Sequence, residues 1–456
     1  MPFVTPSRSA RLALGLSASI LCYGSLWATP ALADEDAPPQ LTADLVEREK
    51  LTGDWGGART QLREAGVEID VDLTADSSYN LGGGLKKGKG FTGLLQLGLT
   101  LDLEKLVGWT GGEFYAGAYF IRGHGITANE TGNLLGISNI EFPHANLLGE
   151  VYLKQTLLDD KLVFKIGQLA ADGDFITSDT AALFVNSTFG WPGLNGANLY
   201  SGGPAYPVPT PGVYALYAFT EALSVQAGLY NGDPAGRDNL NKHNLDFPVN
   251  DGAFAIGEAI YKTEISGLPG TYKVGAWYNS LHFDDLRRVD GAGAPIRNKG
   301  DYALYGVIDQ TLWQSGGEAA DLKNPTPSGP AQSLSVFARA VVAPQSDRNL
   351  IDYYFDGGFN AKGFTPGRPD DVFGVAVGYA HISKDAQRAD RIAGAPVRSS
   401  EIAIEASYQA KVTGWLNIQP YFQYIVRPGG GDPDPDRPNR RVKDAKVIGF
   451  RTQVAF

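Results

Sequence analysis

The chain has 456 residues, with 39 Lys and Arg against 50 Asp and Glu. Its formal net charge of −11 argues against nucleic acid as a partner, because binding to phosphates requires a basic surface. Glycine (57 residues), tyrosine (21) and phenylalanine (21) are abundant, whereas cysteine and methionine occur once each. This composition favours β-strands and turns over helices.

Residues 1–33 have the features of a secretory signal peptide. Arg8 and Arg11 precede the apolar run "LALGLSASILCY", and residues 31–33 form an A-x-A cleavage site. The apolar run is too short to span a bilayer as a helix. Cleavage after residue 33 leaves 37 basic and 50 acidic residues, a net charge of −13, and removes the single cysteine, Cys22. Neither a disulfide nor thiol chemistry is then expected in the mature chain.

Residues 34–66 are predicted to form a charged lead-in and one short helix. The stretch "TGDWGGARTQLREAGVEID" has Thr52 or Asp54 as a helix cap and Gly66 as a stop. From residue 67 the apolar period changes to two, and in "VEIDVDLTADSSY" acidic residues fill the alternate positions. An alternating apolar and acidic strand suits a wall with hydrocarbon on one side and water on the other.

The same alternation recurs to the end of the chain and predicts an all-β fold, a transmembrane antiparallel β-barrel of about 16 strands. Each strand is about ten residues long, which is the length that a tilted strand needs to cross a bilayer. The predicted strands are 67–79, 92–104, 113–121, 148–157, 161–168, 212–219, 222–230, 253–262, 272–280, 302–312, 333–342, 352–360, 372–381, 400–410, 415–425 and 446–456.

Connection lengths support this reading, because outer-membrane barrels alternate short periplasmic turns with long external loops. The predicted short turns are 158–160, 220–221 and 411–414, and the predicted loops are 122–146, 169–211, 231–252, 281–301, 382–399 and 426–445. Two connections on the periplasmic side, 313–332 and 361–371, are longer than the rhythm requires. The basic segment "GGLKKGKG" at 83–90 is interpreted as a flexible external loop in contact with anionic lipid.

The longest loop, about 169–211, is predicted to fold into the barrel and narrow the pore. It is rich in Asn, Gly and Pro, but residues such as Phe184, Phe189 and Trp191 give it enough apolar content to argue against disorder. A loop of this length is usually functional or disordered. The alternative is a lid or an outer rim.

Several phrases, in this order and spacing, resemble the carbohydrate-selective porin family (OprB-like) over essentially the whole mature chain. They are "GDWGGARTQLREAGV", "FKIGQLAADGDF" followed by "FVNSTFGWP", "LYNGDP", "SVFARAVVAP" with "DRN", "GRPDDVFGVAVGYA" and "LNIQPYFQYIVRPGG". The resemblance implies a sixteen-stranded outer-membrane barrel that passes sugars, with its third loop constricting the pore. The long 313–332 connection departs from that expectation.

The chain ends on an aromatic residue, Phe456, at the end of a predicted strand. The last strand must close against the first, because an open sheet edge in lipid leaves backbone groups unpaired. By analogy with outer-membrane proteins, Phe456 is also the expected contact with the barrel-assembly machinery. Residues that face lipid and residues that face another subunit look alike in one sequence, so a monomer and a homotrimer both stay open.

Candidate sugar contacts follow from the face that each residue takes. Sugar hydroxyls both donate and accept hydrogen bonds, so charged and amide groups can replace lost water, and aromatic rings can stack on the sugar. Most polar residues inside such a barrel only line water. The predicted pore-lining residues are Lys165, Glu258, Lys273, Trp277, Arg339, Glu405, Gln419 and Gln423 on strands, and Asp172, Asp174, Asn186 and Trp191 in the long loop.

Enzyme signatures are missing from the sequence. The five histidines are scattered without metal-ligand spacing, and there is no G-x-S-x-G motif. No cofactor or metal is predicted, although the alternate carboxylates of "DPDPDRPNR" at 432–440 leave calcium binding open. The sequence therefore predicts a bacterial outer-membrane porin for passive diffusion of carbohydrates. The alternatives are a general small-solute porin and a secreted soluble β-protein with a binding role.

Overall fold

The computed structural model describes residues 45–236, 241–315 and 332–456. The predicted signal peptide, the lead-in up to residue 44 and most of the predicted 313–332 connection lie outside the described residues. Within the described ranges, no helix is long and apolar enough to cross a membrane.

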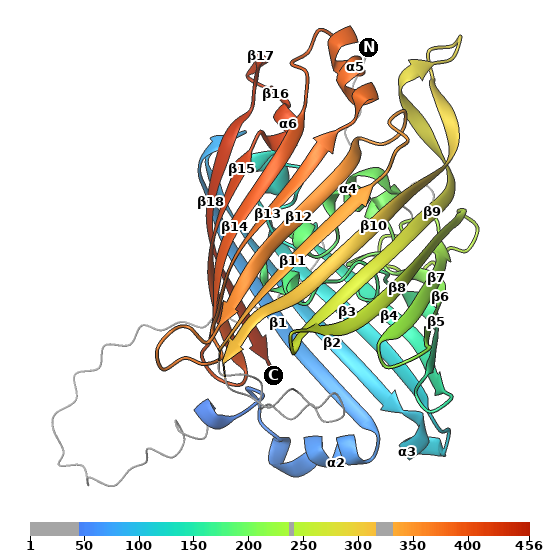
Figure 1. Cartoon of the computed structure of the whole chain (residues 1–456), viewed down its shortest axis with the longest axis vertical. Coiled ribbons are helices and arrows are strands. Elements are labelled where there is room, and N and C mark those ends of the chain that lie inside the picture. Colours follow the sequence, from blue (N-terminus) through green and yellow to red (C-terminus); the bar gives the residue numbers. More distant parts are fainter. Residues whose placement is uncertain (1–44, 237–240, 316–331) are drawn as a thin grey trace, which may run out of the picture. The chain divides into compact units, whose positions relative to one another are not determined.

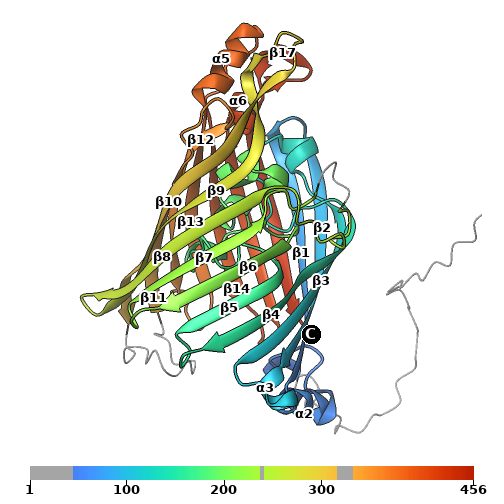
Figure 2. The same ribbon diagram turned by 90° about the vertical axis from the view of Figure 1, so that its right-hand side faces the viewer.

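Sixteen antiparallel strands close into a single barrel, in which β1 pairs with both β2 and β18 (Figure 1 and Figure 2). The prediction of sixteen strands is confirmed. The strands of the barrel are β1 (Val67–Gly84), β2 (Gly88–Asp102), β3 (Gly112–His124), β4 (Ala145–Leu157), β5 (Leu162–Leu169), β6 (Thr210–Ala218), β7 (Leu223–Asn231), β8 (Ala253–Ile265), β9 (Leu268–Val289), β10 (Pro295–Ser315), β11 (Gln332–Val342), β12 (Ile351–Lys362), β13 (Val372–Ile382), β14 (Ser400–Lys411), β15 (Leu416–Val426) and β18 (Lys443–Ala455).

The remaining elements are short and lie between the strands or before them. The helices are η1 (Trp55–Gly57), α2 (Ala58–Glu64), α3 (Leu103–Val107), η2 (Thr127–Thr131), η3 (Ala181–Leu183), η4 (Ser187–Phe189), α4 (Gly193–Asn198), η5 (Tyr200–Gly202), α5 (Lys384–Ile392) and α6 (Pro428–Gly431). A separate hairpin of β16 (Pro433–Asp434) and β17 (Arg437–Arg441) lies between β15 and β18.

The two-residue period assigns each strand an apolar outer face and a more polar inner face. On β9, the outward Val274 is 64% exposed, whereas the inward Trp277 is 1% exposed. A barrel of this kind has no free edge, so every strand backbone finds a partner without water. The apolar exposure on the outer wall is therefore the surface that contacts hydrocarbon.

The N-terminal end of β1 and the C-terminal end of β18 meet at the periplasmic rim. Pairing runs from Gly84 opposite Lys443 to Asp72 opposite Ala455. The N–H of Phe456 donates to the carbonyl of Val71 at 2.8 Å, so the terminal residue is tied to the first strand although the strand itself ends at Ala455.

The segment before the barrel docks on the same rim. The N–H of Leu51 donates to the carbonyl of Ala455 at 2.8 Å, and Arg59 of α2 donates to the carbonyl of Phe456 at 2.8 Å. Asp54 accepts hydrogen bonds from the N–H and the hydroxyl of Thr60. The predicted cap is nevertheless wrong, because α2 begins at Ala58 with Gly57, and not Thr52 or Asp54, at its N-cap.

The prediction of an external loop at 281–301 is wrong. There β9 and β10 continue as a long hairpin, and only residues 290–294 form the turn. The carboxylate of Asp290 accepts from the N–H groups of Ala292 and Ala294, at 2.8 and 3.0 Å, which fixes this turn. The many charged residues make this segment look like a loop in the sequence, because residues 287–297 at the tip of the hairpin are exposed on both faces.

The interpretation of 83–90 as a flexible loop is also wrong. The strands β1 and β2 extend through most of it, and only residues 85–87 form the turn between them. The predicted short turns at 158–160, 220–221 and 411–414 and the remaining long loops are present at the expected places.

Closure between β1 and β18 can be tested at Gly83. This residue has φ +72°, and a Cβ atom there would collide with the carbonyl oxygen of Asp444 in β18. Gly108 has a similar φ of +76° but open space around it. Gly108→Ala should cost only the conformational term of about 1–2 kcal/mol, whereas Gly83→Ala should also separate the two strands.

The measurement is the temperature at which the compact, unboiled form disappears on a gel. We expect a clearly larger decrease for Gly83→Ala than for Gly108→Ala. Equal decreases would mean that the tight contact between Gly83 and Asp444 does not hold this end of the barrel closed.

Candidate functional site in the barrel lumen

Two loops fold into the barrel and bind inward-facing side chains of distant strands. In loop 170–209, the N–H of Ile176 donates to Glu258 of β8 at 2.9 Å, and the N–H of Val185 donates to Glu405 of β14 at 2.8 Å. In loop 125–144, the N–H of Leu134 donates to Glu401 of β14 at 2.8 Å. Figure 1 shows α4 and its flanking segments inside the ring of strands. The two loops therefore occupy much of the lumen.

Arg339 of β11 is the most heavily bonded of these anchors. Its guanidinium donates to the carbonyls of Ile176 (3.1 Å), Thr188 (3.0 Å), Phe189 (2.9 Å) and Gly190 (2.8 Å). It also binds the carboxylate of Asp356, and its side chain is fully buried. All the N–H groups of the guanidinium are used in these contacts. Arg339 therefore holds loop 170–209 and has no hydrogen-bond donor left for a solute.

The inward-facing carboxylates act on the loop N–H groups in the same way. Glu405 accepts from Val185 and Asn186, both at 2.8 Å, and Glu258 accepts from Ile176. Both carboxylates are buried. A buried charge is tolerated when several donors surround it, so these two residues bind loop backbone in place of water.

The other predicted strand residues also bind the loops. Gln419 donates to the carbonyl of Leu183 at 2.7 Å, and Gln423 donates to the carbonyl of Ile137 at 2.8 Å. Lys273 donates to the carbonyl of Thr177 at 2.8 Å. Trp277 is buried and donates to the side chain of Asn195 at 3.0 Å. Within the loop, Asn186 donates to Gln423 at 3.0 Å.

Two further anchors, which bind the second inward loop, were not among the residues predicted from the sequence. Glu401 accepts from Leu134, Leu135 and Gly429 at 2.7–2.8 Å. Arg451 of β18 binds the carboxylate of Asp76 in β1 at 2.7 Å and also reaches the side chain of Asn139 at 2.6 Å. The alternation along each strand places both charged residues on the inner face, and this could have been predicted. Nothing local in the sequence indicates which loop would cover them.

The inner wall of β1 to β5 is different, because several of its polar and aromatic side chains keep contact with solvent. Tyr115 of β3 and Tyr152 of β4 stack with ring centroids 5.2 Å apart. Lys165 of β5 lies 2.8 Å from a carboxylate oxygen of Asp174. Its Nζ is 5.5 Å from the centroid of the Tyr152 ring and 4.8 Å from that of Tyr214.

This group combines an ion pair with aromatic faces, which is the chemistry that a sugar can use. Lys165 and Asp174 were predicted from the sequence, whereas Tyr115 and Tyr152 were not. Tyr115 lies two residues after the inward Glu113, and Tyr152 lies two residues before the inward Lys154, so both rings lie on the inner face of their strands. This spacing could have identified them.

Two other predicted loop residues keep partial contact with solvent. Asp172 is partly exposed and accepts from the N–H of Tyr206 at 2.9 Å. Burial raises the pKa of Asp172 to about 6, although the hydrogen bond from Tyr206 acts in the opposite direction. Trp191 is half-buried and donates through its ring N–H to the carbonyl of Gly202 at 2.9 Å.

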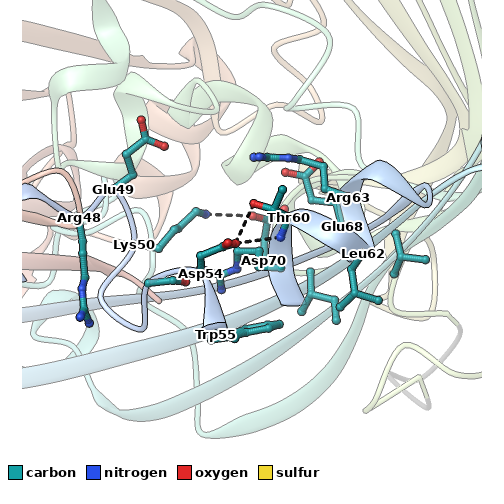
Figure 3. A pocket seen from close by; sticks show the side chains of 14 residues that line it. Arg48, Glu49, Lys50, Asp54, Trp55, Thr60, Leu62, Arg63, Glu68 and Asp70 are labelled. Carbon is teal, nitrogen blue, oxygen red and sulfur yellow. Dashed lines mark hydrogen bonds and ion pairs between the residues drawn. The ribbon is translucent and has the colours of Figure 1, made fainter. Parts of the chain in front are cut away.

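A cavity of about 410 Å³ lies where the N-terminal segment meets β1 at the periplasmic rim (Figure 3). Lys50 lies 3.0 Å from Asp70 of β1, and the guanidinium of Arg59 lies 4.2 Å from the centroid of the Trp55 ring. Residues of both charge signs line this cavity, so it offers a hydrated surface at the end of the barrel.

The described residues contain no cluster of three or more His, Cys, Asp or Glu side chains that could hold a metal ion. In the 432–440 loop, Asp434 lies 2.7 Å from Arg437.

Arg339→Leu should release loop 170–209, because it leaves four loop carbonyls without a hydrogen-bond donor and leaves Asp356 as a buried, unpaired charge. We expect a loss of roughly 3–5 kcal/mol in stability and a larger single-channel conductance. In the double variant with Asp356→Leu, the buried charge is gone but the carbonyls stay unbound. Stability should then partly recover while the conductance stays high; wild-type conductance in both variants would contradict the anchoring role of Arg339.

Comparisons with known proteins agree with this geometry. A family model described as carbohydrate-selective porin, OprB family, matches residues 87–456. The chain is 27% identical over 468 residues to Porin B of Pseudomonas aeruginosa, covering 95% of this chain and 97% of that protein. It is 26% identical over 450 residues to the putative porin QuiX of Acinetobacter baylyi, covering 90% of this chain and 94% of that protein.

The high-pH structure of Pseudomonas putida OprB is similar in fold, with a TM-score of 0.78 and 26% identity, covering 90% of this chain and 99% of that chain. The region matched by the family model, residues 87–456, includes fifteen of the sixteen barrel strands in full, from β2 to β18, and both inward loops. The chain therefore belongs to the OprB family of carbohydrate-selective porins and is a porin of the bacterial outer membrane.

Proposed function

We propose that sugars cross this porin along the inner wall of β1 to β5, beside loop 170–209. Lys165, Asp172 and Asp174 are the charged groups that contact the solute there. The observation that carries this proposal is the ion pair of Lys165 and Asp174, which lies among tyrosine rings and stays partly exposed. The anchors on β8 to β15 are instead occupied by loop backbone.

During passage, the sugar forms weak hydrogen bonds with side chains of the pore and readily exchanges them for hydrogen bonds with water. A sugar that enters a narrow pore loses part of its hydration shell, and charged side chains can replace those hydrogen bonds. The rings of Tyr115 and Tyr152 offer apolar faces for the C–H side of a sugar ring. Passage also requires that the solute leave readily, and exposed side chains that exchange with water meet this requirement.

Loop 170–209 sets the width of the passage as a fixed element. Its backbone is bound from strands β8, β11 and β14 by the buried side chains of Glu258, Arg339 and Glu405. Opening it would expose several buried charges at once, so thermal motion does not act as a gate.

Export and membrane insertion of the chain are proposed to depend on its N-terminal segment and on its last residue. The signal peptide at residues 1–33 directs export, and Phe456 is the contact with the barrel-assembly machinery. The side chain of Phe456 is partly exposed at the periplasmic rim while its backbone is bonded to Val71, which supports a role in recognition before closure.

Lys165→Met tests the sugar contact. Loss of one charge-assisted hydrogen bond of about 1.5 kcal/mol should weaken sugar blockade of the channel roughly tenfold. The measurement is planar-bilayer conductance with graded mono- and disaccharides. Lys161→Met, in an exposed turn outside the lumen, is the matched control and should behave as wild type. If no sugar blocks even the wild-type channel, the protein is a general small-solute porin.

The raised pKa of Asp172 predicts a pH dependence of ion selectivity. With a pKa of about 6, this carboxyl is charged at pH 7.5 and neutral at pH 5. Cation preference, measured as a reversal potential in a salt gradient, should therefore fall as the pH decreases through 6. Asp172→Asn should remove this inflection, whereas Asp179→Asn, at an exposed position in the same loop, should keep it. An inflection that survives Asp172→Asn would assign the titration to another group.

A further inference from the structure

The outer wall of the barrel is hollowed at the junction of β18, β1 and β2. A cavity of about 570 Å³ is lined there by His124 and by residues 77–79, 89–91 and 448–450. Its apolar side chains point away from the lumen, with Tyr79 41% and Phe91 49% exposed. The cavity lies near the external ends of these strands, because the opposite ends carry the N-terminal segment and Phe456.

The strand register explains why this part of the wall is concave. Ser77 lies between Phe450 of β18 and Phe91 of β2. Two residues further toward the periplasm, Ala75 lies between Thr452 and Gly93. The small side chain of Ser77 therefore forms a floor between the rings of Phe450 and Phe91, which is a suitable shape for an acyl chain.

Three lysines surround the external end of this cavity. Lys89 lines it and lies opposite Tyr79, and Lys446 lies two residues before Ile448, which also lies opposite Tyr79. Lys87 is in the adjacent turn. Among the described residues, no carboxylate lies within 4.0 Å of any of the three amino groups, although salt bridges elsewhere in the barrel are common.

Other charged groups near these lysines do not neutralise them. Glu130 lies 3.8 Å from the amino group of Lys86, in the same turn as Lys87, and among the described residues it forms no ion pair with the other three lysines. Arg122 of β3 lies opposite Gly93 and binds only neutral groups, including the side chain of Asn146 at 2.7 Å. Asp444 accepts from the hydroxyl of Tyr424 at 3.0 Å and from the N–H of Arg427 at 2.9 Å. On a protein with a net charge of −11, this is a local concentration of unneutralised positive charge.

We propose that this surface is a binding site for a phosphorylated, acylated glycolipid of the outer leaflet. The lysines bind the phosphates at the level of the headgroups, and an acyl chain lies in the groove above Ser77. Lys and Arg next to a membrane surface attract anionic lipids, and Tyr79 has the amphipathic ring that is enriched at this depth. The glycolipid supplies the negative charge that the protein does not.

The test uses the full mature protein in detergent and native mass spectrometry. The probe is bis-phosphorylated lipid A, compared with the same lipid without phosphates. We expect the wild type to retain the phosphorylated lipid preferentially. Replacement of two lysines, Lys89→Gln with Lys446→Gln, should weaken that binding roughly tenfold or more. The matched control is Lys161→Gln with Lys262→Gln, at exposed positions near the other rim.

A second variant tests the groove without changing charge. Ser77→Leu fills the floor but keeps the wall apolar, so the barrel should fold and run as a compact band on an unboiled gel. Binding of lipid A should decrease, whereas Ala227→Leu, on the exposed outer face of β7, should leave it unchanged.

Three results would overturn the proposal. The first is equal binding of the lipids with and without phosphates. The second is wild-type affinity in both the lysine and the Ser77 variants. The third is a lipid-free trimer that dissociates in Ser77→Leu, because the groove would then be covered by a second copy of the chain.

Discussion

The structure depends on one constraint: each backbone N–H and C=O must have a partner wherever water is excluded. In the wall, closure between β1 and β18 meets this requirement, since an open edge in hydrocarbon would leave a row of unpaired groups. In the lumen, loop 170–209 has little regular secondary structure to pair its own backbone. The strands supply the missing partners through inward-facing side chains, with Arg339 for carbonyls and Glu405 and Glu258 for N–H groups.

This division is also the basis of the solute path proposed above. A side chain that binds loop backbone is buried and fixed, so Arg339, Glu405 and Trp277 shape the pore without touching what passes through it. The groups that remain available are those which the loops leave uncovered, on β1 to β5. Lys165 belongs to this second class because its partner, Asp174, is a side chain at the exposed edge of the loop.

The strands could be predicted from the sequence because the alternation that lipid imposes is local, as in residues 67–79 of β1. The hairpin at 281–301 could not be predicted, because residues 287–297 at its tip are exposed on both faces and the alternation disappears there. For the site, parity placed Arg339 and Glu405 on the inner face. It could not separate an anchor from a sugar contact, because that difference depends on which loop lies against the residue. Asp76 with Arg451, which joins three segments far apart in sequence, shows the same limit.

A fixed constriction has a consequence for selectivity. Because loop 170–209 is held by buried charges on strands from β8 to β14, moving it to fit each solute would leave those charges without partners. Discrimination must then come from charges and rings at set positions. In the proposed passage, the carboxylates of Asp172 and Asp174 outnumber the ammonium of Lys165, and Lys154 is paired with Glu113. An anion should then be repelled, while neutral polyhydroxy solutes lose little because they can donate to the carboxylates. Preference for neutral sugars over anionic solutes of equal size therefore follows from the same anchoring that makes the loop rigid.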